Sequence, residues 1–199
     1  MDQGRLAVGA RDAMVSDQSN AGAVYLFEVN GTSPTQLARI TASDATAGDR
    51  FGISVDLSGN LLGVGASQAD AENFSNSGAA YLFRLEANGS VTELGKMTHN
   101  NGQQNDYFGE TIAIGSNFVA VGTPQDSVLW EGNNKLRAGT VTIFKIEANG
   151  TPVYASTLTA PTPNNINLYF GKSIAMSGDF LLVGENKRTI THSEEGVAY

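Results

Sequence analysis

The chain has 199 residues, of which 41% are hydrophobic, 16% are charged and 23 are glycine, and its formal net charge is −8. This acidic balance, without any basic cluster that carries interleaved aromatic residues, argues against nucleic acid as a partner. There is no cysteine, which excludes disulfides, thiolate catalysis and cysteine-based zinc sites. Many glycines and few charges indicate short strands joined by tight turns, as in an all-β protein.

Four apolar runs that contain a Val-Gly pair recur along the chain. They are Leu6–Ala10, Leu62–Ala66, Val119–Thr123 and Leu181–Glu185. Their glycines are 56, 57 and 62 residues apart, and a period of this size indicates repeated structural units. Because each run is almost entirely apolar, it predicts a strand that is covered on both faces.

Two further motifs keep the same register. A glycine followed by alternating bulky residues occurs at Gly22–Phe27, Gly78–Phe83, Gly139–Phe144 and Gly196–Tyr199. A Phe-Gly pair opens Phe51–Val55, Phe108–Ile112 and Phe170–Ile174. Three markers that share one period of about 57 residues predict a single tandem array over residues 1–199.

Each unit is expected to contain four antiparallel strands. In the second unit these are Ile53–Leu57, Leu61–Ala66, Ala79–Glu86 and Val91–Thr98. Asn88-Gly89 joins the last two, because both central residues of such a tight turn need positive φ. Along the chain, the units span approximately 1–45 (partial), 46–103, 104–163 and 164–199 (partial).

Repeated four-stranded antiparallel units of this length predict the blades of a β-propeller. Coils of a β-solenoid are the alternative, but solenoid repeats are usually much shorter. We therefore expect an all-β fold with an incomplete ring of roughly 3.5 to 4 blades. The three-stranded units at both ends favour a fragment of a larger protein, and their open blade edges predict self-association.

The motifs Phe-Gly-x-Ser-[Val/Ile], Val-Gly-Ala and Gly-Ala-x-Tyr-Leu-Phe resemble the FG-GAP repeat of integrin α-subunit propellers and of many bacterial surface proteins. The resemblance covers essentially the whole chain and is closest to the bacterial type. The third and fourth copies depart from the pattern at Thr123 and Glu185. The resemblance implies an extracellular or cell-surface location, although this chain begins without a signal peptide and has no apolar run long enough for membrane insertion.

Integrin-type repeats bind calcium between their first two strands through an Asp-x-Asp-x-Asp-Gly-like loop, which supplies several oxygen ligands. This chain has Ser58–Asn60, Gly115–Asn117 and Ser177–Asp179 at those turns. The usual calcium motif is therefore missing there, so we expect no calcium site at these turns; we predict no cofactor for the chain, with calcium as the alternative.

One face of the array is predicted to carry the long loops 11–21, 67–77, 124–138 and 186–195. These loops differ in length and composition while the strands repeat, which is typical of a recognition surface. Trp130 and Arg137, in the longest loop, are the candidate ligand-binding residues; packing against the adjacent loop is the alternative for Trp130. Asp44, Asp49 and Asp106 precede Phe-Gly pairs, and we interpret them as turn-capping residues, with a metal ligand as the alternative.

Catalytic signatures are missing from the sequence. His99 and His192 lie in polar loop segments without a nucleophile or metal-binding context, and we expect both at the surface. A catalytic propeller would have to use acids of the long loops, and no pair among them has a spacing that predicts proximity: Asp12, Asp17, Asp70 and Asp126. We therefore expect a protein that is not an enzyme.

Two functions follow from the scaffold and the resemblance. The first is a non-catalytic, adhesion-like module that binds a protein or glycan ligand. The second is an accessory propeller domain of a secreted hydrolase or another multidomain enzyme. The sequence of the parent gene on either side of this chain would separate them.

Overall fold

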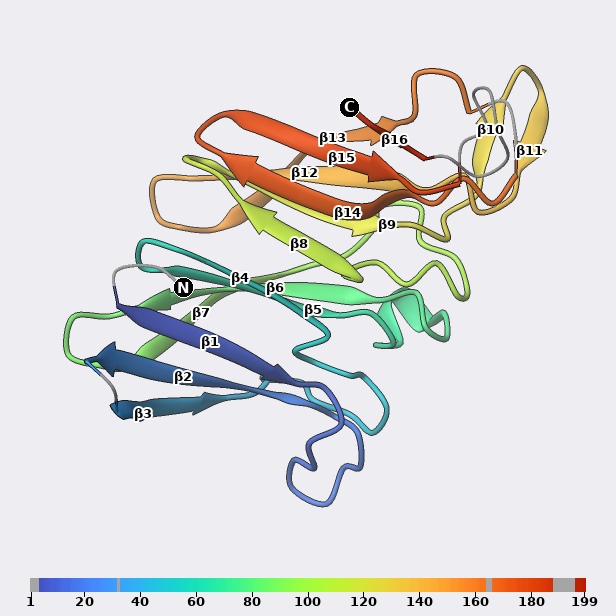
Figure 1. Ribbon diagram of the computed structural model, residues 1–199. Helices are drawn as coiled ribbons and strands as arrows, with labels where there is room; N and C mark the ends of the chain where they lie inside the picture. Colours follow the sequence, from blue (N-terminus) through green and yellow to red (C-terminus); the bar gives the residue numbers. More distant parts are fainter. Residues whose placement is uncertain (1–3, 32, 164–165, 188–195) are drawn as a thin grey trace.

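The computed structural model describes residues 4–31, 33–163, 166–187 and 196–199. Four antiparallel sheets follow one another in chain order and pack side by side (Figure 1). The first sheet consists of β1 (Arg5–Ala10), β2 (Ala23–Asn30) and β3 (Ser33–Ile40). The second consists of β4 (Ser54–Ser58), β5 (Leu61–Ala66), β6 (Ala79–Leu85) and β7 (Val91–Met97).

The third and fourth sheets repeat this order. The third consists of β8 (Thr111–Ile114), β9 (Phe118–Thr123), β12 (Thr140–Ile146) and β13 (Pro152–Thr159). The fourth consists of β14 (Phe170–Ser177), β15 (Phe180–Glu185) and β16 (Val197–Ala198). The predicted all-β class and the four-stranded antiparallel units are confirmed, and the sheets form no closed ring within the described residues.

Two local elements were not expected from the sequence. A short hairpin, β10 (Val128–Trp130) with β11 (Asn133–Lys135), forms inside the long loop of the third unit. One 3₁₀ turn, Ala71–Asn73, forms in the corresponding loop of the second. Both lie in loops where no repeat pattern guides a sequence-based prediction.

Consecutive sheets meet at interfaces that we call seams, and each seam depends on a contact between two glycines. A Cβ atom on Gly65 of β5 would overlap the carbonyl oxygen of Gly109, which belongs to the Phe-Gly pair of the next unit. Gly9 faces Gly52, and Gly122 faces Gly171, in the same way. The Val-Gly and Phe-Gly motifs are therefore the two halves of one backbone contact.

Hydrogen bonds reinforce the same contact. The Ser54 hydroxyl donates to the Gly109 carbonyl oxygen at 2.8 Å, and the Thr111 hydroxyl donates to that of Gly171 at 2.7 Å. In addition, the backbone N–H of Phe108 donates to the carbonyl oxygen of Ser77 in the preceding unit at 2.9 Å. The phenylalanine of each Phe-Gly pair is thus fixed to the sheet before it.

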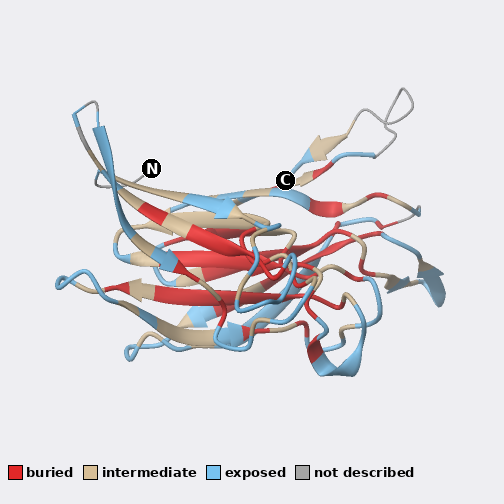
Figure 2. Cartoon of the chain, turned by 90° about the horizontal axis from the view of Figure 1, so that it is seen from below, coloured by how far each residue is buried: buried red, intermediate tan, exposed pale blue. Residues whose placement is uncertain are grey.

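Each seam also contains an apolar core, and the central strands carry most of the buried residues (Figure 2). In the first seam, the Phe51 ring packs edge-on against Tyr81 and Phe83, with ring centroids 5.5 and 5.9 Å apart. In the second seam, Phe108 packs against Phe144 with centroids 6.1 Å apart. The alternating aromatic residues of the third strand thus cover the phenylalanine of their own unit.

Candidate functional site

The antiparallel order brings the long loops of the first three units to one end of their sheets, on the right in Figure 1, and most of the predicted loop 186–195 lies outside the described residues. We call this end the loop face. It contains a pocket with a volume of about 390 Å³, the loop-face pocket, formed by two successive segments that precede Phe-Gly pairs and by both ends of the loop between them. Five amide side chains contribute to its wall: Gln103, Gln104, Asn105, Gln125 and Asn167.

The other side chains of the pocket are of mixed character. Asp106 and Arg137 are its charged residues, and Leu136 and Ile166 are aliphatic residues that remain half exposed. The pocket therefore combines hydrogen-bond donors and acceptors with a small apolar surface, which is the usual composition of a site that orients a ligand.

Backbone hydrogen bonds hold the segments around the pocket together. Asn167 N–H donates to the carbonyl oxygen of Leu136 at 2.8 Å, and Tyr169 N–H donates to that of Arg137 at 3.1 Å. Asn105 N–H donates to the carbonyl oxygen of Ser75 in the loop of the second unit at 3.0 Å. The segments of the wall are thus hydrogen-bonded to one another and to the loop of the second unit.

The predicted turn-capping role of the aspartates holds for two of the three. Asp49 accepts hydrogen bonds from the backbone N–H and the hydroxyl of Thr46, both at 2.7 Å, and Asp106 accepts one from the backbone N–H of Gln103 at 2.6 Å. Asp44 differs, because it accepts from the Tyr81 hydroxyl at 2.7 Å and from Lys96 Nζ at 2.6 Å.

Asp106 is the buried charged group of the loop-face pocket, with 5% of its surface exposed. Burial raises the pKa of its carboxyl to about 6; the hydrogen bond from Gln103 lowers the pKa, and the nearby charge of Asp126 raises it further. At neutral pH the wall of the pocket therefore carries a carboxylate whose ionisation the fold opposes.

The expected surface position of His99 is wrong. Its side chain is only 8% exposed and lies at the second seam, where its ring is 6.1 Å from that of Phe108. On β12 at that seam, Thr142 stands where the second unit has the larger Tyr81. His192 lies outside the described residues.

Trp130 and Arg137, the two candidate ligand-binding residues, lie in different places. Arg137 lines the loop-face pocket, whereas Trp130 lies half-buried on β10, paired with Asn133 across the hairpin. The neighbouring Leu129 is 73% exposed. Of the two candidate residues only Arg137 lines the pocket, and the amide side chains beside it carry no repeat signal that would have identified them.

The acids of the long loops do not gather in one place. Asp12 forms an ion pair with Arg11 at 3.5 Å in the first unit, and Asp70 accepts a hydrogen bond from Asn76 N–H in the second. Asp126 is buried at the second seam beside His99. Within the ranges that the structure describes, no three His, Asp or Glu residues come together as a metal site.

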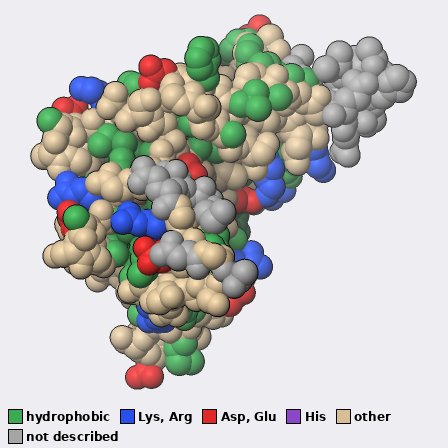
Figure 3. All heavy atoms as spheres, turned by 60° about the vertical axis from the view of Figure 1, so that its left-hand side comes forward, with side chains coloured by type: hydrophobic (Ala, Val, Ile, Leu, Met, Phe, Trp, Pro, Cys, Tyr) green, Lys and Arg blue, Asp and Glu red, His purple; other side chains and the backbone are tan. Residues whose placement is uncertain are grey.

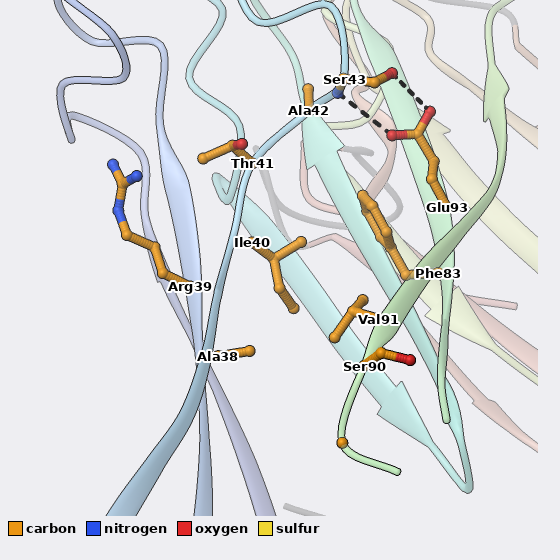
Figure 4. A pocket seen from close by; sticks show the side chains of 11 residues that line it. Ala38, Arg39, Ile40, Thr41, Ala42, Ser43, Phe83, Ser90, Val91 and Glu93 are labelled. Atoms are coloured by element: carbon orange, nitrogen blue, oxygen red, sulfur yellow. Dashed lines mark hydrogen bonds between the residues drawn. The ribbon is translucent and has the colours of Figure 1, made fainter. Parts of the chain in front are cut away.

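A second hollow, the rim groove, lies between β3 and the β6–β7 hairpin and has a volume of about 490 Å³ (Figure 4). Ile40, Phe83 and Val91 form its apolar floor, and Glu93 closes one end by accepting hydrogen bonds from the backbone and hydroxyl of Ser43 at 3.3 and 3.0 Å. This groove offers fewer polar groups to a ligand than the loop-face pocket does.

The opposite end of the sheets carries the tight turns. On the side that Figure 3 brings forward, acidic and basic side chains are interspersed among neutral ones, so that neither sign forms a large patch. None of the described helical segments is long and apolar enough to span a membrane.

The burial of Asp106 predicts a stability that depends on pH. Because the folded pKa of Asp106 lies above the ordinary value, its contribution to the free energy of unfolding is fully present below about pH 4. This contribution is lost as the pH rises through about 6. The loss amounts to about 3 kcal/mol at most, from a shift of about two units. Asp106→Asn should remove this component, as urea denaturation of both proteins between about pH 4 and 7.5 would show. Parallel pH profiles would contradict the assignment.

Comparison with known families agrees with the repeat structure. The model of the FG-GAP repeat matches residues 34–83 and 91–144. Each match begins in or at the outermost strand of one sheet and ends in the third strand of the next, so it spans a seam. No curated protein matched the chain. Since the two matches cover half of the sequence, this chain belongs to the FG-GAP repeat family.

Proposed function

We propose that this chain is a non-catalytic propeller module that recognises a protein or glycan ligand through its loop face, outside the cell. The observation that carries the proposal is the loop-face pocket, in which five amides, one carboxylate and one guanidinium surround two exposed aliphatic side chains. Amide groups donate and accept hydrogen bonds at once, so they suit the hydroxyls of sugars and the peptide groups of proteins.

The non-catalytic assignment is supported by the roles of the charged groups. The Asp106 carboxylate caps its own turn through Gln103 N–H, and Arg137 is exposed at the edge of the pocket. In these positions Asp106 fixes its loop, and Arg137 is placed to contact a ligand. The same pocket would anchor a substrate if the chain served as an accessory domain of a secreted hydrolase, which is the second role that we consider.

The pocket predicts ligand binding that depends on its rim. The labelled chain should bind a subset of a glycan array or a protein array, and Arg137→Ala combined with Gln104→Ala should weaken that binding about tenfold or more, because side-chain hydrogen bonds are lost. Lys145→Ala, which removes an exposed ion pair with Glu147, is the control and should bind normally. No binding on either array, or equal loss in both variants, would contradict the proposal.

We also propose self-association through the exposed side of the fourth sheet. Phe180 and Leu182 are 84% and 56% exposed there, whereas Gly63 and Ala120, at the positions equivalent to Leu182, pack against the following sheet. A large exposed apolar face favours association with a second copy of the chain.

Sedimentation would measure this association. The chain should form dimers or larger species at tens of micromolar, in the affinity range of a modest interface. The variant Phe180→Ser with Leu182→Ser should remain monomeric. A stable monomer of the unaltered chain at that concentration would contradict the prediction.

A further inference from the structure

Three polar residues at the second seam occupy positions that alanines occupy at the first. The strand registers make the positions equivalent in pairs: His99 and Ala42, Asp126 and Ala69, Thr140 and Ala79. All six side chains are buried. Where the first seam has three small apolar residues, the second seam therefore has a histidine, a carboxyl and a hydroxyl.

These three polar side chains contact one another across the seam. His99 Nε2 lies 3.4 Å from Asp126 Oδ2, and the same oxygen accepts a hydrogen bond from the Thr140 hydroxyl at 2.8 Å. His99 follows β7 of the second sheet, whereas Asp126 and Thr140 belong to the third unit. The cluster thus joins two sheets through side chains.

Three buried polar residues in place of three alanines destabilise the fold unless His99 and Asp126 share a proton. A buried ion pair seldom stabilises a fold more than apolar residues of similar volume, and one buried charge without its partner is strongly destabilising. Burial raises the pKa of the Asp126 carboxyl, and the imidazole of His99 acts against this. The charge of Asp106, in the segment before β8, also acts on the cluster, and β12 contributes the Thr140 hydroxyl.

We propose that His99 and Asp126 hold one proton between them and act as a pH-sensitive latch between the second and third sheets. With one proton, the pair is either neutral or a matched ion pair, and the seam is strongest. When the pH rises and the proton leaves, a buried carboxylate remains without a cation. When the pH falls and a second proton binds, an imidazolium remains without an anion. Both changes weaken the seam.

The first test compares stability profiles against the alanine arrangement that the chain itself uses at the first seam. All proteins carry Asp106→Asn, so that the pocket carboxyl does not contribute. The triple variant carries His99→Ala, Asp126→Ala and Thr140→Ala. Between about pH 6 and 8.5, the unfolding equilibrium constant of the parent should rise about tenfold relative to that of the triple variant, because the parent loses stability at high pH. A constant ratio would overturn the proposal.

The second test follows the histidine itself and remains informative if the triple variant does not fold. In NMR titrations of the whole chain, with His192→Gln used for assignment, Asp126→Asn should lower the midpoint of the His99 ring by about one pH unit or more, because the imidazolium loses its counter-charge. Thr140→Val should raise the midpoint of the His99 ring, since the carboxylate of Asp126 then depends more on the imidazolium. An unchanged midpoint in Asp126→Asn would show that the two groups do not share a proton.

Discussion

The close contact between two glycines at each seam is the constraint on which the rest of the array depends. Neither glycine of a pair such as Gly65 and Gly109 leaves room for a side chain, so the sheets approach until their backbones touch. This distance in turn sets where hydroxyls such as Ser54 reach a carbonyl oxygen and how the Phe51 ring fits beneath Tyr81. In this chain the Val-Gly and Phe-Gly motifs therefore serve the packing of the sheets.

Fixing the seams leaves the loop face free to vary. The strands and the Phe-Gly pairs repeat, while the segments around the loop-face pocket share only their backbone hydrogen bonds and the position of a turn. Such a division is what allows one scaffold to present different side chains in each unit. Because the second seam also carries ionisable groups, the array is not uniform even within its repeated part, and its neighbouring seams should respond differently to pH.

The sequence predicted the scaffold well because strand spacing and glycine position are local properties. The strand Leu61–Ala66 was predicted with its observed bounds, β6 and β7 end one residue before their predicted ends, and β4 is shifted by one residue at both ends. The hairpin β10–β11 was missed, since no repeat pattern extends into that loop.

The site was harder to predict, because it depends on contacts between units. His99 was predicted to lie at the surface because its neighbours in the sequence are polar, yet it is buried beside Phe108 at the second seam. The amides of the loop-face pocket come from segments separated by tens of residues, and only the packed sheets bring them together. Asp106 was identified as a turn cap from its place before Phe108, but its raised pKa follows from burial that the sequence does not reveal.

Adding one methyl group at a seam is the most direct test of whether the glycine contact determines how the sheets pack. Gly65→Ala places a Cβ atom against the carbonyl oxygen of Gly109 and should lower the free energy of unfolding, measured in urea, by about 3 kcal/mol or prevent folding. Gly59→Ala is the matched control, because its Cβ would meet no neighbour and only its positive φ is strained, at a cost of about 1 kcal/mol. If Gly65→Ala costs no more than Gly59→Ala, the glycine contact does not determine how the sheets pack.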